Sequence, residues 1–210
     1  MKRDDLAVYF IMGTENCVKA PLETLREALE AGITMFQFRE KGPRALTGQA
    51  YEQFARDCQQ LCATYGVPFV VNDDVALATR LRADGLHIGQ DDARLQQAKE
   101  QFNGFIGVSV HTADEMEAAI VGGCDYVGIG PIYTTASKAD AEAPCSTAFP
   151  AAMHKQFPQC PIVAIGGIQT HNVEPVLSTG VDGVSVISAL CHSLDMKHTV
   201  KQLKGETIYH

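Results

Sequence analysis

The sequence has fewer basic residues than acidic ones, and this shortage excludes one broad class of partner. Its 210 residues include 17 Lys and Arg against 25 Asp and Glu, which gives a formal net charge of −8. A surface that binds nucleic acid needs clustered Lys and Arg to neutralise phosphates. We therefore expect no nucleic acid among its partners, and an anionic small molecule would have to be bound by local groups.

Long apolar runs are also missing near the start of the chain. Residues 1–5 are mostly charged, and the apolar run at 7–12 is far shorter than the roughly 20 residues of a membrane span. The composition, 46% hydrophobic and 20% charged, is typical of a globular protein with a sizeable core. We expect a cytoplasmic protein without a membrane partner, whose residues 1–210 form one domain, and leave a homo-oligomer open.

Several catalytic and metal-binding motifs are absent. The seven cysteines include no CxxC pair and no Cys/His cluster at zinc spacing, so we expect reduced, mostly buried thiols. Cys58 and Cys62 fall on one helical face, where packing is the favoured interpretation. Residues 12–15 do not supply the GxGxxG turn of a dinucleotide-binding sheet. The spacing of residues also shows no Ser-His-Asp or Cys-His arrangement of the kind used in nucleophilic catalysis.

What the chain does contain is a regular alternation of apolar strands and amphipathic helices. The predicted strands are 7–12, 33–38, 67–72, 85–88, 105–110, 126–129, 162–165 and 183–187. The predicted helices are 21–31, 47–65, 75–81, 93–101, 112–120, 148–157, 172–179 and a last stretch from 189 onward. Nearly continuous apolar strands indicate a parallel sheet buried on both faces, and eight strand-helix units predict an α/β fold, a (β/α)8 TIM barrel.

Active sites of such barrels lie at the carboxyl ends of the strands, which makes the residues there candidates. After the second strand, period-two alternation places Gln37, Arg39 and Lys41 on one side, and Phe38 and Glu40 on the other. Two cations and an amide on one side are suited to an anionic ligand.

Carboxylates follow the third and fourth strands. Asp74 is explained as a helix cap, and either Asp91 or Asp92 could cap the next helix, whereas a structural role explains Asp73 less well. Carboxylates beside cations are typical of a site for Mg²⁺ that carries a polyphosphate, because Mg²⁺ takes one or two carboxylates plus phosphate oxygens.

The later strand ends add hydroxyls, glycines and histidines. The fifth strand ends with Ser109 and His111, the sixth opens into a hydroxyl-rich loop that ends at Lys138, and the eighth is followed by Ser188. Gly166 and Gly167 would let backbone N–H groups approach a phosphate, although a tight turn also explains them. His87 is more simply interpreted as a hydrogen-bonded core residue than as a catalyst.

These segments resemble the thiamine phosphate synthase family in order and spacing. The matching segments are 37–41, 72–74, 85–92, 107–111, 128–133, 164–168 and 183–188. The resemblance extends from about the first strand to the eighth. It implies a transferase of thiamine biosynthesis that joins a hydroxymethylpyrimidine diphosphate to a thiazole phosphate, carboxylated or not, and releases diphosphate.

The resemblance also assigns expected roles, with Mg²⁺ as cofactor and small molecules as substrates. The pyrimidine diphosphate would be held by Gln37, Phe38, Arg39, Glu40, Lys41, Asn72, Ser109 and Lys138. The thiazole phosphate would be held by Thr135, Ala136, Ser137, Gly167, Ile187 and Ser188. Asp73 and Asp92, rather than Asp91, would bind the metal. Among these residues Arg39, Lys41, Ser109 and Lys138 are expected to act in catalysis.

Two positions depart from the family pattern. The chain has Thr135-Ala136-Ser137-Lys138 where the family usually has Thr-x-Thr-Lys, and Thr134 replaces a frequent proline. Ser137 keeps the hydroxyl, so we expect a tuned thiazole site. The mechanism expected is a dissociative displacement without a covalent enzyme intermediate. Two alternatives are a thiazole tautomerase-like paralogue, which would not need the metal and diphosphate residues, and a non-catalytic phosphate-ligand sensor.

Overall fold

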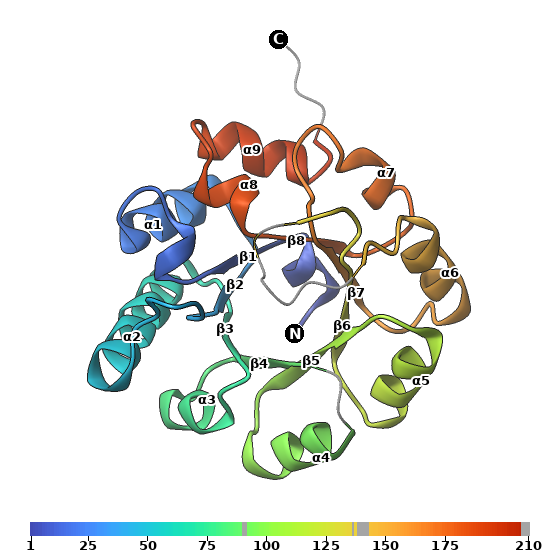
Figure 1. Ribbon diagram of the computed structural model, residues 1–210, viewed down its shortest axis with the longest axis horizontal. Coiled ribbons are helices and arrows are strands. Elements are labelled where there is room, and N and C mark those ends of the chain that lie inside the picture. Colours follow the sequence, from blue (N-terminus) through green and yellow to red (C-terminus); the bar gives the residue numbers. More distant parts are fainter. Residues whose placement is uncertain (90–91, 136, 138–142, 207–210) are drawn as a thin grey trace.

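Eight parallel strands form a closed barrel in which each strand pairs with its neighbours in sequence and β8 returns to β1 (Figure 1). The computed structural model describes residues 1–89, 92–135, 137 and 143–206, without the side chains of Asp92 and Ala93. The strands are β1 Val8–Met12, β2 Met35–Phe38, β3 Phe69–Asn72, β4 Gly85–Ile88, β5 Phe105–Val110, β6 Tyr126–Ile129, β7 Ile162–Ile165 and β8 Gly183–Val186. The predicted (β/α)8 barrel is confirmed.

The helices form a ring outside the barrel, and they follow the strands in sequence (Figure 1). They are α1 Pro21–Ala31, α2 Gly48–Tyr65, α3 Val75–Leu81, α4 Asp92–Gln101, α5 Ala113–Val121, α6 Ala148–Gln156, α7 Glu174–Leu177, α8 Ser188–Cys191 and α9 Met196–Leu203. Among the described residues no helix combines the length and the apolar character needed to cross a membrane.

The helix ends that the sequence predicts are present. Gly32 and Gly66 follow α1 and α2 in left-handed conformation, with φ of 93° and 67°, where a side chain would be strained. Asp74 accepts a hydrogen bond from the Leu77 N–H at 2.8 Å and so caps α3. Thr112 and Glu115 form the predicted capping box at the start of α5. These local signals were therefore sufficient to place the helix ends.

The last part of the chain differs from the prediction. The helix expected at 172–179 is limited to Glu174–Leu177, and the single final helix expected from residue 189 is divided into α8 and α9. The division occurs at Asp195, whose side chain accepts from the His198 N–H at 2.9 Å and starts a new helix. The helix that begins at Ser188 ends at Cys191, and the cap at Asp195 starts α9 as a separate helix.

The apolar core has two parts. The larger part lies between the strands and the surrounding helices, and includes Phe38 and the fully buried Cys58 and Cys62. Burial raises the pKa of the Cys62 thiol to about 12, so this thiol is a packing group, as the sequence predicts. The smaller part fills the barrel itself. It consists of Leu6, Tyr9, Met35, Val70, Tyr126 and Val163.

The amino-terminal end of the barrel is held by one hydrogen-bond arrangement that occurs four times. The residue before each even-numbered strand accepts a side-chain hydrogen bond from an N–H group at or near the start of the preceding odd-numbered strand. The pairs are Thr34 with Val8, Asp84 with Phe69, Asp125 with Ile106, and Asp182 with Ile162, at 2.7 to 2.9 Å. Three of these acceptors are the Asp residues that directly precede β4, β6 and β8. This end is therefore structural, and the opposite end is left for a site.

Candidate active site

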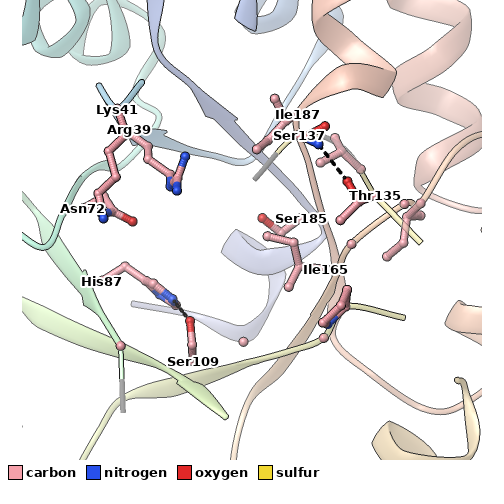
Figure 2. A pocket seen from close by; sticks show the side chains of 18 of the residues that line it. Arg39, Lys41, Asn72, His87, Ser109, Thr135, Ser137, Ile165, Ser185 and Ile187 are labelled. Carbon is pink, nitrogen blue, oxygen red and sulfur yellow. Dashed lines mark hydrogen bonds between the residues drawn. The ribbon is translucent and has the colours of Figure 1, made fainter. Parts of the chain in front are cut away.

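A pocket of about 420 Å³ opens at the carboxyl end of the barrel, where the sequence places the candidate residues. Figure 2 shows Arg39, Lys41 and Asn72 on one side of it, with Thr135, Ser137 and Ile187 on the opposite side. Other residues that line it include Asp73, His87, Arg94, Ser109, His111, Gly167, Ser185 and Ser188. The pocket therefore has a cationic and amide side facing a side of hydroxyls and glycine.

The alternation predicted after β2 is present. Arg39 and Lys41 both line the pocket, and Arg39 is almost entirely buried. Phe38 points outward and packs on Tyr51 and Phe54 of α2, while the Glu40 carboxylate accepts hydrogen bonds from the Thr14 hydroxyl and the Leu46 N–H. Neither Phe38 nor Glu40 is among the described lining residues, so the structure does not bring their side chains to the pocket.

Gln37 also points inward but lies deeper than Arg39. Its side chain is 1% exposed, and its Nε2 donates a hydrogen bond to the Tyr9 hydroxyl at 2.7 Å. It is not among the described residues that line the pocket. Gln37 therefore belongs to the barrel interior just beneath the site.

Asp73 is surrounded by positive and donor groups. Lys41 Nζ lies 2.5 Å from its Oδ2, Asn72 Nδ2 donates to the same oxygen at 2.8 Å, and Arg94 Nη2 lies 3.4 Å from Oδ1. Its backbone has a φ of 63°, a left-handed conformation in which Asp and Asn are enriched. Partial burial by itself would raise the pKa of this carboxyl, but the Lys41 hydrogen bond and the charges of Lys41 and Arg94 outweigh it and lower the pKa.

The floor of the pocket is made by polar side chains of β4, β5 and β8. His87 Nε2 lies 2.9 Å from Ser109 Oγ, a contact drawn in Figure 2, and its Nδ1 lies 3.0 Å from the Tyr126 hydroxyl. His87 is thus hydrogen-bonded, as predicted, but it also reaches the pocket. Ser185 is 2% exposed, and its hydroxyl has no hydrogen-bond partner among the described residues. His111 also lines the pocket, and its Nδ1 lies 3.5 Å from a Glu115 oxygen.

The wall opposite Arg39 and Lys41 is formed by the loops after β6, β7 and β8. Thr135 Oγ1 accepts a hydrogen bond from the Ser137 N–H at 3.2 Å. Gly167 has a φ of 65°, and a Cβ built there would lie 2.6 Å from the Thr134 carbonyl oxygen. Only glycine allows the two loops to approach this closely. Ser188 Oγ accepts from Gln169 Nε2 at 3.0 Å, which fixes the third loop.

Some predicted site residues lie outside the part of the chain that the structure describes. They are Ala136, Lys138 and the side chain of Asp92, together with the alternative candidate Asp91. The roles expected for these groups therefore stay predictions. Within the described residues, no three His, Cys, Asp or Glu side chains are grouped as they would be to hold a metal ion. Of the two predicted metal ligands, Asp73 is the one whose side chain the structure describes, and it lines the pocket.

Sequence reasoning missed Arg94 and Ser185. Arg94 lies in the first turn of α4, where the helix dipole disfavours a cation, and a basic residue there is a signal that could have been noticed. Ser185 occupies an inward position of β8, opposite Tyr9 and Ile165 in the sheet register. A hydroxyl in an otherwise apolar strand was its only sequence signal.

A second pocket of about 740 Å³ adjoins the first on the side of β1 and β8. The two share lining residues, namely Arg39, Lys41, Thr135, Ser137, Gly167, Ile187 and Ser188. Two hollows with a common wall can hold two ligands in contact, each with its own polar groups.

Comparisons with known proteins agree with this geometry. Residues 8–190 match the family model of thiamine monophosphate synthase. A thiamine-phosphate synthase of Lysinibacillus sphaericus is 59% identical over 98% of this chain and 97% of its own, and one of Bacillus thuringiensis is 50% identical over 96% and 92%. The solved thiamine phosphate pyrophosphorylase from Pyrococcus furiosus superposes with a TM-score of 0.85 at 33% identity, over 97% of this chain and 96% of that one. The chain therefore belongs to the thiamine monophosphate synthase family.

Proposed function

We propose that this protein is a thiamine-phosphate synthase, a transferase that joins a 4-amino-2-methylpyrimidine carrying a diphosphooxymethyl group to a thiazole phosphate and releases diphosphate. The relatives named for this activity match over nearly the full chain. The observation that carries the proposal is that one pocket groups two cations, Lys41 and Arg94, around the Asp73 carboxylate and has a wall of hydroxyls and glycine on the opposite side. The cations are suited to bind a diphosphate, and the opposite wall is suited to bind a phosphate monoester.

The cationic side would bind and activate the leaving diphosphate. Arg39 and Lys41 extend from the end of β2, and Arg94 reaches the same space from α4. Lys41 and Arg94 both contact the Asp73 carboxylate. A diphosphate would offer them more negative charge than one carboxylate does, and neutralising this charge makes diphosphate a better leaving group. Lys138 is expected to add a further cation.

Asp73 fits the role expected of a Mg²⁺ ligand. Its carboxylate faces the pocket and stays ionised because its pKa is lowered, and Mg²⁺ needs only one or two carboxylates when phosphates and waters complete its shell. Asp92, which starts α4 near Arg94, is the expected second ligand. When bound, the metal would supply additional neutralisation of the diphosphate.

The opposite wall would hold the thiazole phosphate. Hydroxyls of Thr135, Ser137 and Ser188 and the backbone of Gly167 are donors that a phosphate accepts. Because these residues line both hollows, a thiazole held there would face the pyrimidine across their common boundary. The departure from the usual threonine at Ser137 keeps the donor hydroxyl, so the site is tuned and not lost.

The reaction needs positioning more than it needs an acid or a base. The bond between the pyrimidine methylene and the diphosphate oxygen breaks, and the electron pair leaves with diphosphate. The aminopyrimidine shares the positive charge left behind, and the thiazole nitrogen then forms the new C–N bond at the methylene. No protein nucleophile takes part, and the pocket residues orient the two reactants and stabilise the separating charges.

Two alternatives make different demands on the same pocket. A thiazole tautomerase-like paralogue would use the hydroxyl and glycine wall but would have no use for Lys41, Asp73 and Arg94 grouped opposite it. A phosphate-ligand sensor would bind the product tightly without turnover. The grouped charges favour the synthase.

The test is to incubate the purified protein with both substrates and to measure thiamine phosphate with and without Mg²⁺. We expect product and diphosphate in equal amounts, and only when the metal is present. Activity that persists in a chelator would remove the metal from the proposal, and tight product binding without turnover would favour the sensor. Parallel reactions with the carboxylated and the decarboxylated thiazole phosphate would identify the form that is used.

A further inference from the structure

A chain of hydrogen bonds crosses the barrel interior and ends at the pocket floor. Gln37 Nε2 donates to the Tyr9 hydroxyl at 2.7 Å, and that hydroxyl lies 2.9 Å from the hydroxyl of Tyr126. The Tyr126 oxygen lies 3.0 Å from His87 Nδ1, and His87 Nε2 lies 2.9 Å from Ser109 Oγ. Five side chains from five strands are thus joined, and the last one, Ser109, lines the pocket.

The direction of donation along this chain follows from its first donor. An amide nitrogen can only donate, so the Tyr9 oxygen accepts from Gln37, and among the described residues the Tyr126 oxygen is the remaining hydrogen-bond partner that can accept the proton of this buried hydroxyl. The Tyr126 proton then goes to His87 Nδ1, which must be the unprotonated ring nitrogen. In this order of donation His87 carries its proton on Nε2 and donates it to Ser109 Oγ.

The two tyrosine hydroxyls are able to keep this order. Both side chains are fully buried, and this burial raises the pKa of Tyr9 and of Tyr126 far above the ordinary tyrosine value. Neither hydroxyl ionises near neutral pH, so each remains both a donor and an acceptor.

The neighbouring strands leave room for the rings in this chain. A Cβ on Gly107 would lie 2.0 Å from the Tyr126 ring, and a Cβ on Gly128 would lie 3.3 Å from His87 Cε1. Both glycines lie at inward positions, paired in register with Tyr126 and Ser109 respectively. The chain of hydrogen bonds therefore depends on the residue types at inward positions of three adjacent strands, β4, β5 and β6.

We propose that Tyr126 and His87 are positioning residues that make Ser109 a hydrogen-bond donor toward the pocket. Because Ser109 Oγ already accepts from His87, its own proton is left for a ligand that can only accept, and a phosphate oxygen is such an acceptor. The inference rests on the proposed function and deepens it: the acceptor is an oxygen of the departing diphosphate. No proton is transferred in this role, and the hydrogen bond strengthens as negative charge develops.

The first test asks whether Tyr126 acts through Ser109. We expect Tyr126→Phe to lower kcat roughly 10-fold, with little change in the KM of the thiazole phosphate. In a Ser109→Ala background the same substitution should lower kcat by no more than about 2-fold, since the group that it positions is already absent. Equal losses in both backgrounds would overturn the proposal. Tyr65→Phe is the matched control, because that hydroxyl donates to Glu30 at the surface, away from the pocket.

The second test uses His87, and remains informative if Tyr126→Phe does not fold. His87→Gln keeps an N–H donor near Ser109 and an acceptor near Tyr126, whereas His87→Leu keeps neither. We expect most of kcat to survive in His87→Gln and to be lost in His87→Leu. Equal loss in both variants would show that the imidazole acts in some other way.

A third measurement does not depend on activity at all. Long-range ¹H–¹⁵N spectra of the ligand-free protein distinguish the two imidazole tautomers, and the His87 signals are assigned from the His87→Gln variant. We expect the Nε2–H tautomer in the wild type. A Nδ1–H tautomer would overturn the proposal even in an active enzyme, while an inactive protein with the Nε2–H tautomer would reject the proposed function only.

Discussion

Lys41 Nζ lies 2.5 Å from Oδ2 of Asp73, and the two residues follow adjacent strands at the mouth of the barrel. This contact, together with Arg94, balances a carboxylate that would otherwise be an uncompensated, partly buried negative charge. A diphosphate with its metal would replace each partner with a stronger one. We therefore expect the ion pair to hold both groups where the substrate and the metal would meet them.

Substitutions at two neighbouring aspartates, Asp73 and Asp74, should distinguish an effect on metal binding from an effect on fold stability. Asp73→Asn removes the charge but tolerates the left-handed backbone, so we expect a loss of Mg²⁺-dependent turnover of at least about 100-fold with the fold intact. Asp74→Ala removes the cap of α3 and should lower the free energy of unfolding by about 1 kcal/mol without changing the Mg²⁺ dependence. Turnover against Mg²⁺ concentration and urea unfolding measure the two effects. Wild-type rates in Asp73→Asn would remove Asp73 from the site.

The lowered pKa of Asp73 predicts a change of stability with pH. The folded pKa lies below the unfolded value of 3.8, so the ionised form stabilises the fold at pH values above 3.8. This contribution is lost as the pH falls from about 4 through the lower, folded pKa. The difference in unfolding free energy between wild type and Asp73→Asn should therefore be larger at pH 6 than at pH 3. A difference that is constant with pH would contradict the ion-pair assignment.

The four hydrogen bonds at the amino-terminal end of the barrel should contribute to the stability of the fold and not to activity. Asp125→Ala leaves the buried N–H of Ile106 without its acceptor, which should cost about 1 to 3 kcal/mol of unfolding free energy. Turnover at 25 °C should be unchanged, because the catalytic end lies at the other end of the strands. Glu117→Ala, on the exposed face of α5, is the control and should stay within about 0.5 kcal/mol of wild type. Reduced turnover in folded Asp125→Ala would show that the two ends are coupled.

Substitution of Ser185 should have the opposite combination of effects, with substrate binding changed and stability nearly unchanged. Its buried hydroxyl has no partner among the described residues, so Ser185→Ala should change the unfolding free energy by less than about 0.5 kcal/mol. If a substrate uses this hydroxyl, its KM should rise about 5- to 10-fold, as expected for one lost hydrogen bond. Steady-state kinetics with each substrate varied in turn will show which one is affected. A marked loss of stability with unchanged KM would assign the hydroxyl to the fold instead.

Local sequence signals were strong enough to predict most of the fold. Gly32, Gly66, Asp74 and Thr112 each satisfy a backbone requirement within a few residues of themselves, so their effect can be determined without the rest of the chain. The end of the chain was less predictable. Asp195 starts a helix within a segment whose periodicity continues, and two signals of similar strength compete there.

The site was predictable in part for the same reason. Period-two alternation correctly separated Arg39 and Lys41 from Phe38 and Glu40, because a strand has only two faces. It could not tell how deep each inward side chain lies. Gln37 and Arg39 share a face, yet one hydrogen-bonds to Tyr9 in the interior and the other lines the pocket.

The sequence by itself determined the barrel, the end that carries the site and the types of chemical group found there, since these depend on periodicity and on order along the chain. Only the tertiary structure decided which groups meet. Arg94 reaches Asp73, and Tyr126 reaches His87, across separations of 21 and 39 residues. Such contacts depend on the register between strands and on the space that inward glycines leave, and no local pattern records either of them.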